Sequence, residues 1–268
     1  MNLSFEKWEA AGNTFLVLRA ESLSEKDRAD WVVQATDQRL GIPADGVLFG
    51  RRIGASVLRV RIYNKDGKEA EISLNGLRVA AAFSMSRGQT IKEVHPVDGM
   101  RWDLESFHKT LDGGDVSISR SWRGLPSPQQ VNTGIGVGWR VRGVGNPHLV
   151  IPGEHLPMGA YFRQWGSRLA LHSAFPSGTN VHFVVREKEG EIQMRTWERG
   201  VGPTPSCGSG ALAVATWARA QEGGQTWRCR SPGGCLTVVF GEDRAICSGP
   251  VRRLLSGEMR TEKEGRVD

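Results

Sequence analysis

The sequence predicts an α+β fold made of two similar halves. Ser73-Leu74-Asn75-Gly76 and Cys207-Gly208-Ser209-Gly210 echo one another, because each places a hydroxyl or thiol three residues before a glycine and then continues into an Ala-rich run. The two echoes are 134 residues apart, half of the 268-residue chain. Most of the remaining text consists of short strand-like runs separated by Gly, Pro and Asn, so each half is expected to wrap a mixed sheet around one central helix.

The predicted strands are short runs rich in β-branched and aromatic residues, bounded by turn residues. In chain order they include Thr14–Arg19, Gly46–Phe49, Ser56–Tyr63, Asp115–Ser119, Leu149–Ile151, Asn180–Val185, Ile192–Trp197, Leu236–Phe240 and Arg244–Cys247.

Helical patterns are fewer than strand patterns. The predicted helices are Ser24–Thr36, Gly76–Arg87, Arg163–Leu171 and Ser209–Glu222. The first opens on Ser24 with Asp27 three residues later, an acidic variant of the capping box. The last ends at Gly223-Gly224, as helices often do.

A stretch rich in Pro and Gly, residues 122–134, predicts the boundary between the halves. The expected domains are residues 1–125 and residues 126–268, with the C-terminal segment able to return to the first half. The expected active site lies in the cleft between them.

Composition argues against several classes of partner. The net charge is +6, but the basic residues are interleaved with acidic ones and form no aromatic-studded strip, so no nucleic-acid partner is expected. No apolar run reaches the roughly 18 residues of a membrane span, and the N-terminal text has no apolar signal segment. A cytoplasmic protein without a membrane partner is expected.

The four cysteines do not form a metal-binding pattern. Their spacing contains no CxxC pair, and no histidine stands nearby, so no metal site is expected. Cys229, Cys235 and Cys247 lie in alternating strand-like text and are predicted to be small core residues. Cys207 alone has a setting that suggests chemistry.

Cys207 and Ser73 each stand just before a predicted helix. A helix N-terminus offers unpaired N–H groups and can bind a carboxylate, and it lowers the pKa of a thiol below its usual value of about 8.5. Cys207 is therefore expected to act as a base beside a bound anion. Ser73 is a poorer base because a hydroxyl ionises far less readily. Cys207 also fits a small buried turn residue, and Ser73 fits a helix N-cap.

The pattern resembles the diaminopimelate epimerase family nearly from end to end. The matching segments are Gly12-Asn13-Thr14-Phe15, Ala44-Asp45-Gly46, Arg61 to Gly67 with Asn64 at its centre, Ser73 to Arg78, Gly145-Asn146-Pro147-His148, Phe175 to Val181 with Asn180 near its end, and Trp197-Glu198-Arg199-Gly200 followed by Cys207 to Gly210. In order along one chain, these motifs make a chance match very unusual.

The resemblance implies inversion at an amino-acid α-carbon without a cofactor, by one acid/base group from each half. It implies Cys207 and Ser73 as those groups and a homodimer that acts on a small amino acid. The implied substrate-binding residues are Asn13, Asn64, Leu74, Asn75, Gly76, Asn146, Asn180, Glu198, Arg199, Gly208 and Ser209. His148 is implied as a residue that tunes the reactive groups, whereas the other five histidines have no comparable setting.

The chain departs from the family pattern where the chemistry is most demanding. Ser73-Leu74 stands where the family has Cys-Gly, and Pro203 stands where the family usually has Glu. The leading hypothesis is an epimerase that interconverts LL- and meso-diaminopimelate for lysine and peptidoglycan precursors. The alternatives are a one-base isomerase, dehydratase or epimerase on another amino acid, and a diverged ligand-binding homologue with little or no activity.

Overall fold

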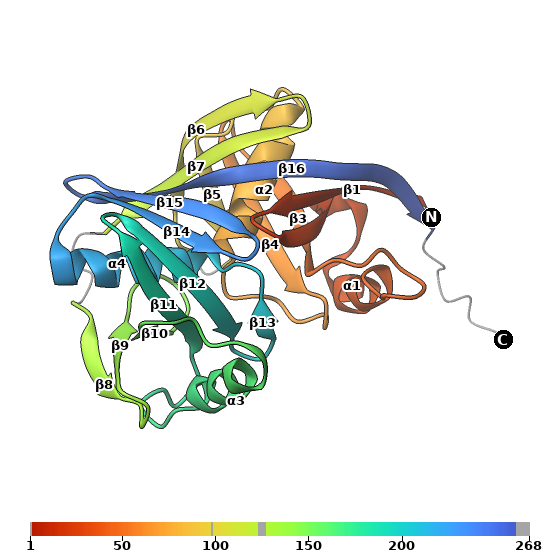
Figure 1. Ribbon diagram of the computed structural model, residues 1–268. Coiled ribbons are helices and arrows are strands. Elements are labelled where there is room, and N and C mark those ends of the chain that lie inside the picture. Colours follow the sequence, from red (N-terminus) through yellow and green to blue (C-terminus); the bar gives the residue numbers. More distant parts are fainter. Residues whose placement is uncertain (1, 98, 123–126, 261–268) are drawn as a thin grey trace. The chain divides into compact units, whose positions relative to one another are not determined.

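The computed structural model describes residues 2–97, 99–122 and 127–260, and its contacts divide the chain into two units (Figure 1). Unit 1 comprises Met1–Ile72, Gly76–Val116 and Pro250–Asp268, as far as these are described. Unit 2 comprises Ser73–Asn75 and Ser117–Gly249. The predicted boundary at 125/126 lies outside the described residues, so the division at that point stays a prediction.

Unit 1 is a mixed sheet with two helices. Its elements are β1 (Asn2–Ala10), β2 (Asn13–Arg19), η1 (Ala20–Ser22), η2 (Glu25–Asp27), α1 (Arg28–Ala35), β3 (Gly46–Ile53), β4 (Val57–Asn64), α2 (Leu74–Ser86), β5 (Glu93–Pro96) and β6 (Trp102–Thr110). Antiparallel and parallel pairings alternate from β1 to β6, beginning with antiparallel β1–β2 and parallel β2–β3. Two further strands, β7 (Gly113–Ser121) and β16 (Arg244–Arg260), carry residues of both units, and the end of β16 pairs with β1.

Unit 2 repeats this plan. Its elements are β8 (Gln129–Asn132), β9 (Val137–Val141), β10 (His148–Pro152), α3 (Gly159–Ala170), β11 (Asn180–Lys188), β12 (Glu191–Glu198), β13 (Gly202–Thr204), α4 (Gly208–Glu222), β14 (Thr226–Ser231) and β15 (Gly234–Phe240). The pairs β9–β10, β11–β12 and β14–β15 are antiparallel, whereas β10–β11 and β12–β14 are parallel.

The repeat extends to the residue register. In unit 1, Phe15 pairs with Gly46 and Leu48 pairs with Ile62; in unit 2, His148 pairs with Asn180 and His182 pairs with Thr196. The second set follows the first at offsets of 133 or 134 residues, the spacing of the two sequence echoes. The predicted α+β class with two similar halves is confirmed.

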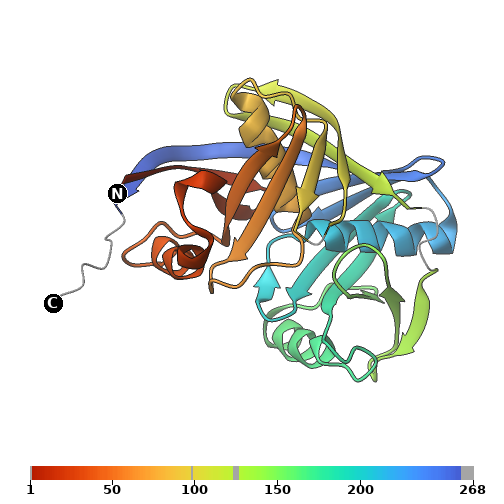
Figure 2. The ribbon, with the colours of Figure 1, turned by 180° about the vertical axis from the view of Figure 1, so that it is seen from behind.

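Helix α4 lies inside unit 2 rather than on its surface. It packs on β9, β10, β11, β14 and β15 (Figure 2). The run from Ala211 to Ala215 is no more than 1% exposed. Small side chains let strands approach the helix closely, which explains why the Ala-rich run forms the centre of the unit.

Aromatic side chains complete each core. In unit 1 Phe49 lies edge-on to Trp31 and Tyr63, at centroid distances of 6.3 and 5.6 Å. In unit 2 Phe162 of α3 contacts the rings of Phe183 and Trp197 at 5.8 and 6.0 Å. Edge-to-face contacts of this kind add modest stability beyond the buried area.

The predicted helix Ser24–Thr36 is instead the 3₁₀ turn η2 followed by α1. The predicted acidic capping box is wrong, because the Ser24 hydroxyl donates to the Asp27 carboxylate and makes no cap with a backbone N–H. Strands β1, β5, β6, β8, β9 and β13 were not predicted, whereas β14 coincides with the strand-like text around Cys229. Several of these strands, such as β6 and β8, contain many polar residues because much of their surface is exposed.

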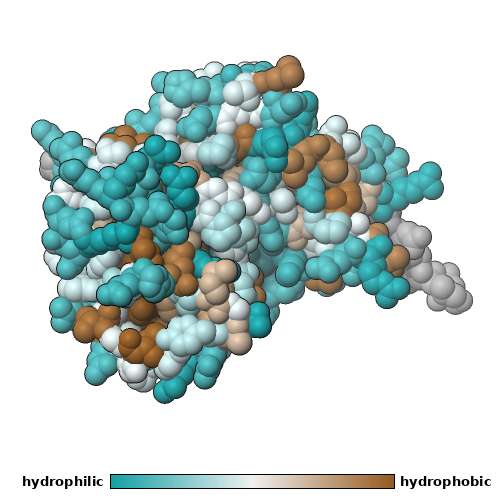
Figure 3. All heavy atoms as spheres, viewed as in Figure 1, coloured by the Kyte–Doolittle hydropathy of each residue, from teal (hydrophilic) through white to brown (hydrophobic). Residues whose placement is uncertain are grey.

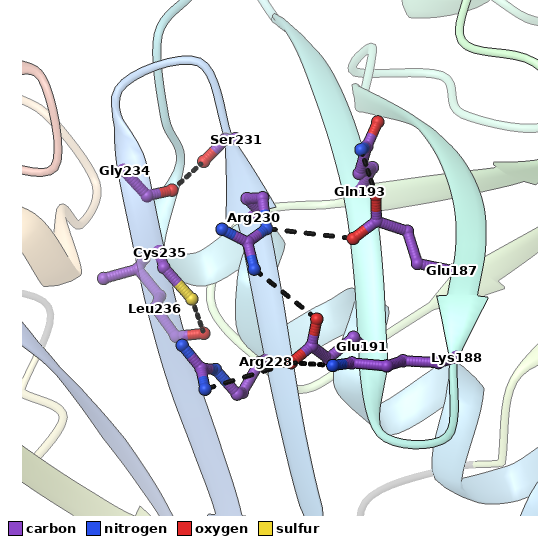
Figure 4. A network of polar contacts seen from close by, with 10 residues as sticks. All are labelled: Glu187, Lys188, Glu191, Gln193, Arg228, Arg230, Ser231, Gly234, Cys235 and Leu236. Carbon is purple, nitrogen blue, oxygen red and sulfur yellow. Dashed lines mark hydrogen bonds and ion pairs between the residues drawn. The ribbon is translucent and has the colours of Figure 1, made fainter.

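Charged residues pair across β11, β12 and β14 of unit 2. Glu191 lies within 3.5 Å of Lys188, 3.4 Å of Arg230 and 3.9 Å of Arg228, and Arg230 also reaches Glu187 at 3.8 Å (Figure 4). The space-filling view is mainly hydrophilic where β14 and β15 lie (Figure 3). Basic residues of unit 2 are thus partly neutralised by acidic neighbours. Within the described residues, no helix is long and apolar enough to cross a membrane.

Candidate active site

Cys207 is the N-cap of α4, which begins at Gly208, one residue before the predicted start at Ser209. Its backbone is extended, and its Sγ accepts a hydrogen bond from the N–H of Gly210 at 3.3 Å. The Ser209 hydroxyl lies 3.5 Å from the same sulfur. The first N–H groups of a helix have no partners within it, so this turn can hold an anion next to the thiol.

Burial raises the pKa of the Cys207 thiol, and the negative charge of Glu198 raises it further. Hydrogen bonds from Ser209 and Gly210 lower the pKa by less. The expectation of a lowered pKa is therefore wrong for the ligand-free protein. The physical reason is that the side chain is only 6% exposed, and the loss of hydration outweighs the field of the helix N-terminus.

The Ser73–Asn75 part of the N-terminal echo lies against the Cys207–Gly210 echo. Ser73 immediately precedes α2, and the segment from Ser73 to Asn75 makes its contacts with unit 2. Asn75 Nδ2 donates to Ser206 Oγ at 3.5 Å. A Cβ added to Gly208 would stand 2.8 Å from Leu74 Cβ and 3.0 Å from Asn75 Oδ1. Only glycine fits at position 208, because the first residues of α2 occupy the space beside it.

Polar residues gather at one end of the unit 2 sheet. His148 opens β10, Asn180 opens β11 beside it, and Glu198 closes β12. Asn180 Oδ1 accepts from the backbone N–H of Arg199 at 2.8 Å, and Arg199 Nη1 donates to the carbonyl of Ser177 at 2.9 Å. The sheet register therefore brings together residues that lie up to 50 positions apart in the sequence.

Asn146 lies in the loop before β10. Its Oδ1 is buried and has no hydrogen-bond partner within the described residues. Since buried acceptors are nearly always paired, this oxygen is suited to a bound ligand or water.

The corresponding end of unit 1 carries the other predicted ligands. Asn13 opens β2 after a tight turn in which Ala11 and Gly12 have φ of 50° and 87°. Asn64 closes β4, opposite Gly46. Gly76 lies in the first turn of α2 and is buried. The roles of these residues and of the predicted unit 2 ligands stay predictions.

Comparison with known proteins identifies the family. A family model for diaminopimelate epimerase matches residues 140–253. A diaminopimelate epimerase of Desulforudis audaxviator is 35% identical over an alignment that covers 96% of this chain and 99% of the relative. The chain belongs to the diaminopimelate epimerase family. A second diaminopimelate epimerase, from Prochlorococcus marinus, is 32% identical over 80% of this chain and 78% of its own.

A solved structure supports the predicted fold independently. A predicted epimerase from Pseudomonas aeruginosa superimposes with a TM-score of 0.74, over 97% of this chain and 100% of that one. Its identity is 16%, so this similarity concerns the fold alone.

The sequence patterns did not identify His182 as a site residue. Its Nε2 lies 2.8 Å from His148 Nδ1, and its Nδ1 lies 3.0 Å from Thr196 Oγ1. Burial lowers the pKa of His182 to about 3, and burial, His182 and Arg199 lower the pKa of His148 well below its usual value. The expectation that the other histidines lack a site-like setting is wrong for His182. A histidine two residues after Asn180, within apolar strand text, was the available signal.

The structure also describes Pro203, the potential metal ligands and the three other cysteines of this diaminopimelate epimerase family member. Pro203 lies in β13, opposite Trp197, and is exposed. Within the described residues, no group of three or more His, Cys, Asp and Glu side chains could hold a metal ion. Cys229 and Cys247 are fully buried, as expected of core residues, whereas Cys235 is half-buried.

Proposed function

We propose that this protein is an epimerase that interconverts LL- and meso-diaminopimelate, by the cofactor-free route that the family resemblance implies. The observation that carries the proposal is Cys207 at the N-cap of α4, next to Glu198, in a chain that is 35% identical to a named diaminopimelate epimerase over nearly its whole length. A small amino acid is the proposed substrate. A cytoplasmic homodimer with no nucleic-acid or membrane partner is the proposed context.

The α-carboxylate of the substrate is proposed to bind the N-terminal turn of α4 at Gly208 and Ser209 and the start of α2 after Ser73. Glu198 suits the substrate ammonium, because it places a carboxylate near the reactive thiol. The amides of Asn13, Asn64, Asn146 and Asn180, with Arg199, would hold the remaining polar ends. Arg199 is already held by Ser177, which fixes the direction of its guanidinium.

Substrate binding would make Cys207 a better base than it is in the free protein. The charge of Glu198 raises the pKa of the thiol, so an ammonium ion paired with Glu198 would offset that effect. The Gly210 N–H stabilises the thiolate through its hydrogen bond to Sγ. Binding and ionisation are thus expected to be coupled.

In the proposed reaction the Cys207 thiolate takes the α-proton and leaves a carbanion stabilised by the bound carboxylate. The Ser73 hydroxyl then gives a proton to the opposite face, and the resulting alkoxide regains a proton from water. The hydroxide formed takes the proton of the Cys207 thiol, which restores the thiolate. Because an alkoxide is high in energy, this second step is expected to limit inversion. For the isomer whose α-hydrogen faces Cys207, exchange with retention should therefore outrun inversion.

One observation favours the one-base alternative over a full two-base epimerase. Leu74, where the family has glycine, is fully buried against Gly208. The side chain thus occupies space at the N-terminus of α2, which would alter the carboxylate cradle on the Ser73 side. A one-base isomerase or dehydratase would need only the Cys207 side, and an epimerase on another amino acid is the further alternative.

The test is incubation with LL- and with meso-diaminopimelate in D₂O, followed by mass spectrometry and chiral chromatography. Deuterium uptake at one α-carbon together with slower inversion is the expected result. Cys207→Ala should abolish exchange, whereas Cys235→Ala, a half-buried cysteine on β15, should retain it. If the protein binds diaminopimelate but exchanges neither isomer, the ligand-binding alternative holds. Exchange of a different amino acid only would assign another substrate.

A further inference from the structure

Thr196, His182 and His148 form a continuous hydrogen-bonded row beneath the N-terminal turn of α4. Their relative exposures are 1%, 0% and 0%. The register of β10, β11 and β12 places all three side chains on one sheet face, because His182 pairs with Thr196 and follows Asn180, the partner of His148, by two residues. A Cβ on Gly210 would stand 2.3 Å from His182 Cε1, so α4 covers this row directly.

The fold does not require polar residues at these positions. In unit 1 the equivalent positions are occupied by Phe15, Leu48 and Ile62, which pair in the same register and are 5%, 0% and 3% exposed. The same architecture is therefore built in unit 1 with an apolar row. Burying polar groups is costly unless every one is hydrogen-bonded, which suggests a functional reason for the row in unit 2.

The order of donors and acceptors follows from the hydroxyl at one end. Within the described residues, the Thr196 hydroxyl has His182 as its one hydrogen-bond partner. A buried hydroxyl proton needs an acceptor, so Thr196 donates to His182 Nδ1. A neutral imidazole carries one proton, which in His182 must then be on Nε2 and is donated to His148 Nδ1. The proton of neutral His148 is left on its Nε2.

The end of this row opposite to Thr196 is His148 Nε2. That nitrogen is buried and has no hydrogen-bond partner within the described residues. It lies on the strand end that also carries Asn180 and Glu198, the end at which the candidate site is built. An N–H there can satisfy an oxygen of a bound molecule but cannot accept a proton.

We infer that Thr196 and His182 are positioning residues that hold His148 as its Nε2–H tautomer, so that His148 donates a hydrogen bond to an acceptor oxygen of the bound amino acid. The identity of the ligand rests on the proposed function, whereas the tautomer does not. In this arrangement His148 is not a general base, and the α-proton must go to Cys207.

The tautomers can be read directly by long-range ¹H–¹⁵N correlation spectra of the full chain labelled with ¹⁵N-histidine, near neutral pH. Resonances are assigned with His148→Gln and His182→Gln. Both histidines are expected to be protonated at Nε2 and bare at Nδ1. Protonation of His148 at Nδ1 in the wild-type protein would overturn the inference, whether or not any variant folds.

Variants of Thr196 give the matched comparison. Thr196→Val removes the donor that orders the row and should shift the nitrogen signals of both histidines toward a mixture of tautomers. Thr196→Ser keeps a hydroxyl and should leave them unchanged. For diaminopimelate inversion, kcat/KM is expected to fall about three- to tenfold in Thr196→Val and to be restored in Thr196→Ser. Unchanged tautomers in Thr196→Val would refute the positioning role. Correct tautomers without turnover would refute only the proposed function.

Discussion

Gly210→Ala should destabilise the protein, although alanine is the better helix former. The added Cβ would lie 2.3 Å from His182 Cε1 and 2.9 and 3.0 Å from its two nitrogens, whereas ordinary contacts begin at 3.4 Å. His182 would therefore have to move by about 1 Å. It is fully buried and held at 2.8 Å by His148 and 3.0 Å by Thr196, so this movement strains or breaks those bonds.

The magnitude follows from three terms. Overpacking a buried site costs about 1–3 kcal/mol, a weakened hydrogen bond costs about 1 kcal/mol, and the gain from replacing glycine with alanine in a helix is about 1 kcal/mol. A net loss of about 1–3 kcal/mol is expected. Urea unfolding should show a lower midpoint with an unchanged m-value.

A double-mutant cycle tests the cause. His182→Ala opens space next to Gly210, so adding Gly210→Ala in that background should cost little or nothing. Ala220→Gly, at an exposed position of the same helix, measures the helix-propensity term alone. Equal costs for Gly210→Ala in the wild-type and His182→Ala backgrounds would refute the reasoning, and so would a stabilising effect in the wild type.

Three further outcomes are expected. Burial lowers the pKa of His182 from 6.5 to about 3. Between these two pH values the His182 side chain is therefore protonated in the unfolded chain but neutral in the folded chain. Stability should be full above pH 6.5 and fall by up to about 1.4 kcal/mol per unit toward pH 3, with a shallower slope for His182→Gln in urea titrations. Ser73→Cys should raise the inversion rate in the D₂O assay. Adding Leu74→Gly to that variant should lower its unfolding free energy by about 2–5 kcal/mol, because Leu74 is fully buried. A double variant as stable as Ser73→Cys would contradict the second expectation. Glu191→Gln, in the exposed ion-pair network, should lower the unfolding free energy measured in urea by less than about 1 kcal/mol. A larger loss would show that the network is cooperative.

Local sequence patterns were sufficient for the framework of this protein. The repeated turn and Ala-rich run at a spacing of 134 residues predicted two similar halves, and placed Cys207 just before a helix. Such features depend on neighbours within one turn or strand, where spacing and side-chain type decide the conformation. The exposed and polar strands, such as β6, escaped prediction because their period is weak when much of the strand faces solvent.

The chemical environment of the site was decided by the tertiary structure. Sequence placed Cys207 at a helix N-terminus and thereby favoured a lowered pKa, but only the packed unit showed the burial that raises it. His182 gained its meaning from His148, 34 positions away, and from Gly210 above it. Hydration, hydrogen-bond partners and close contacts are properties of residues brought together by strand register, so a chain read one segment at a time specifies the groups but not the environment that sets their protonation.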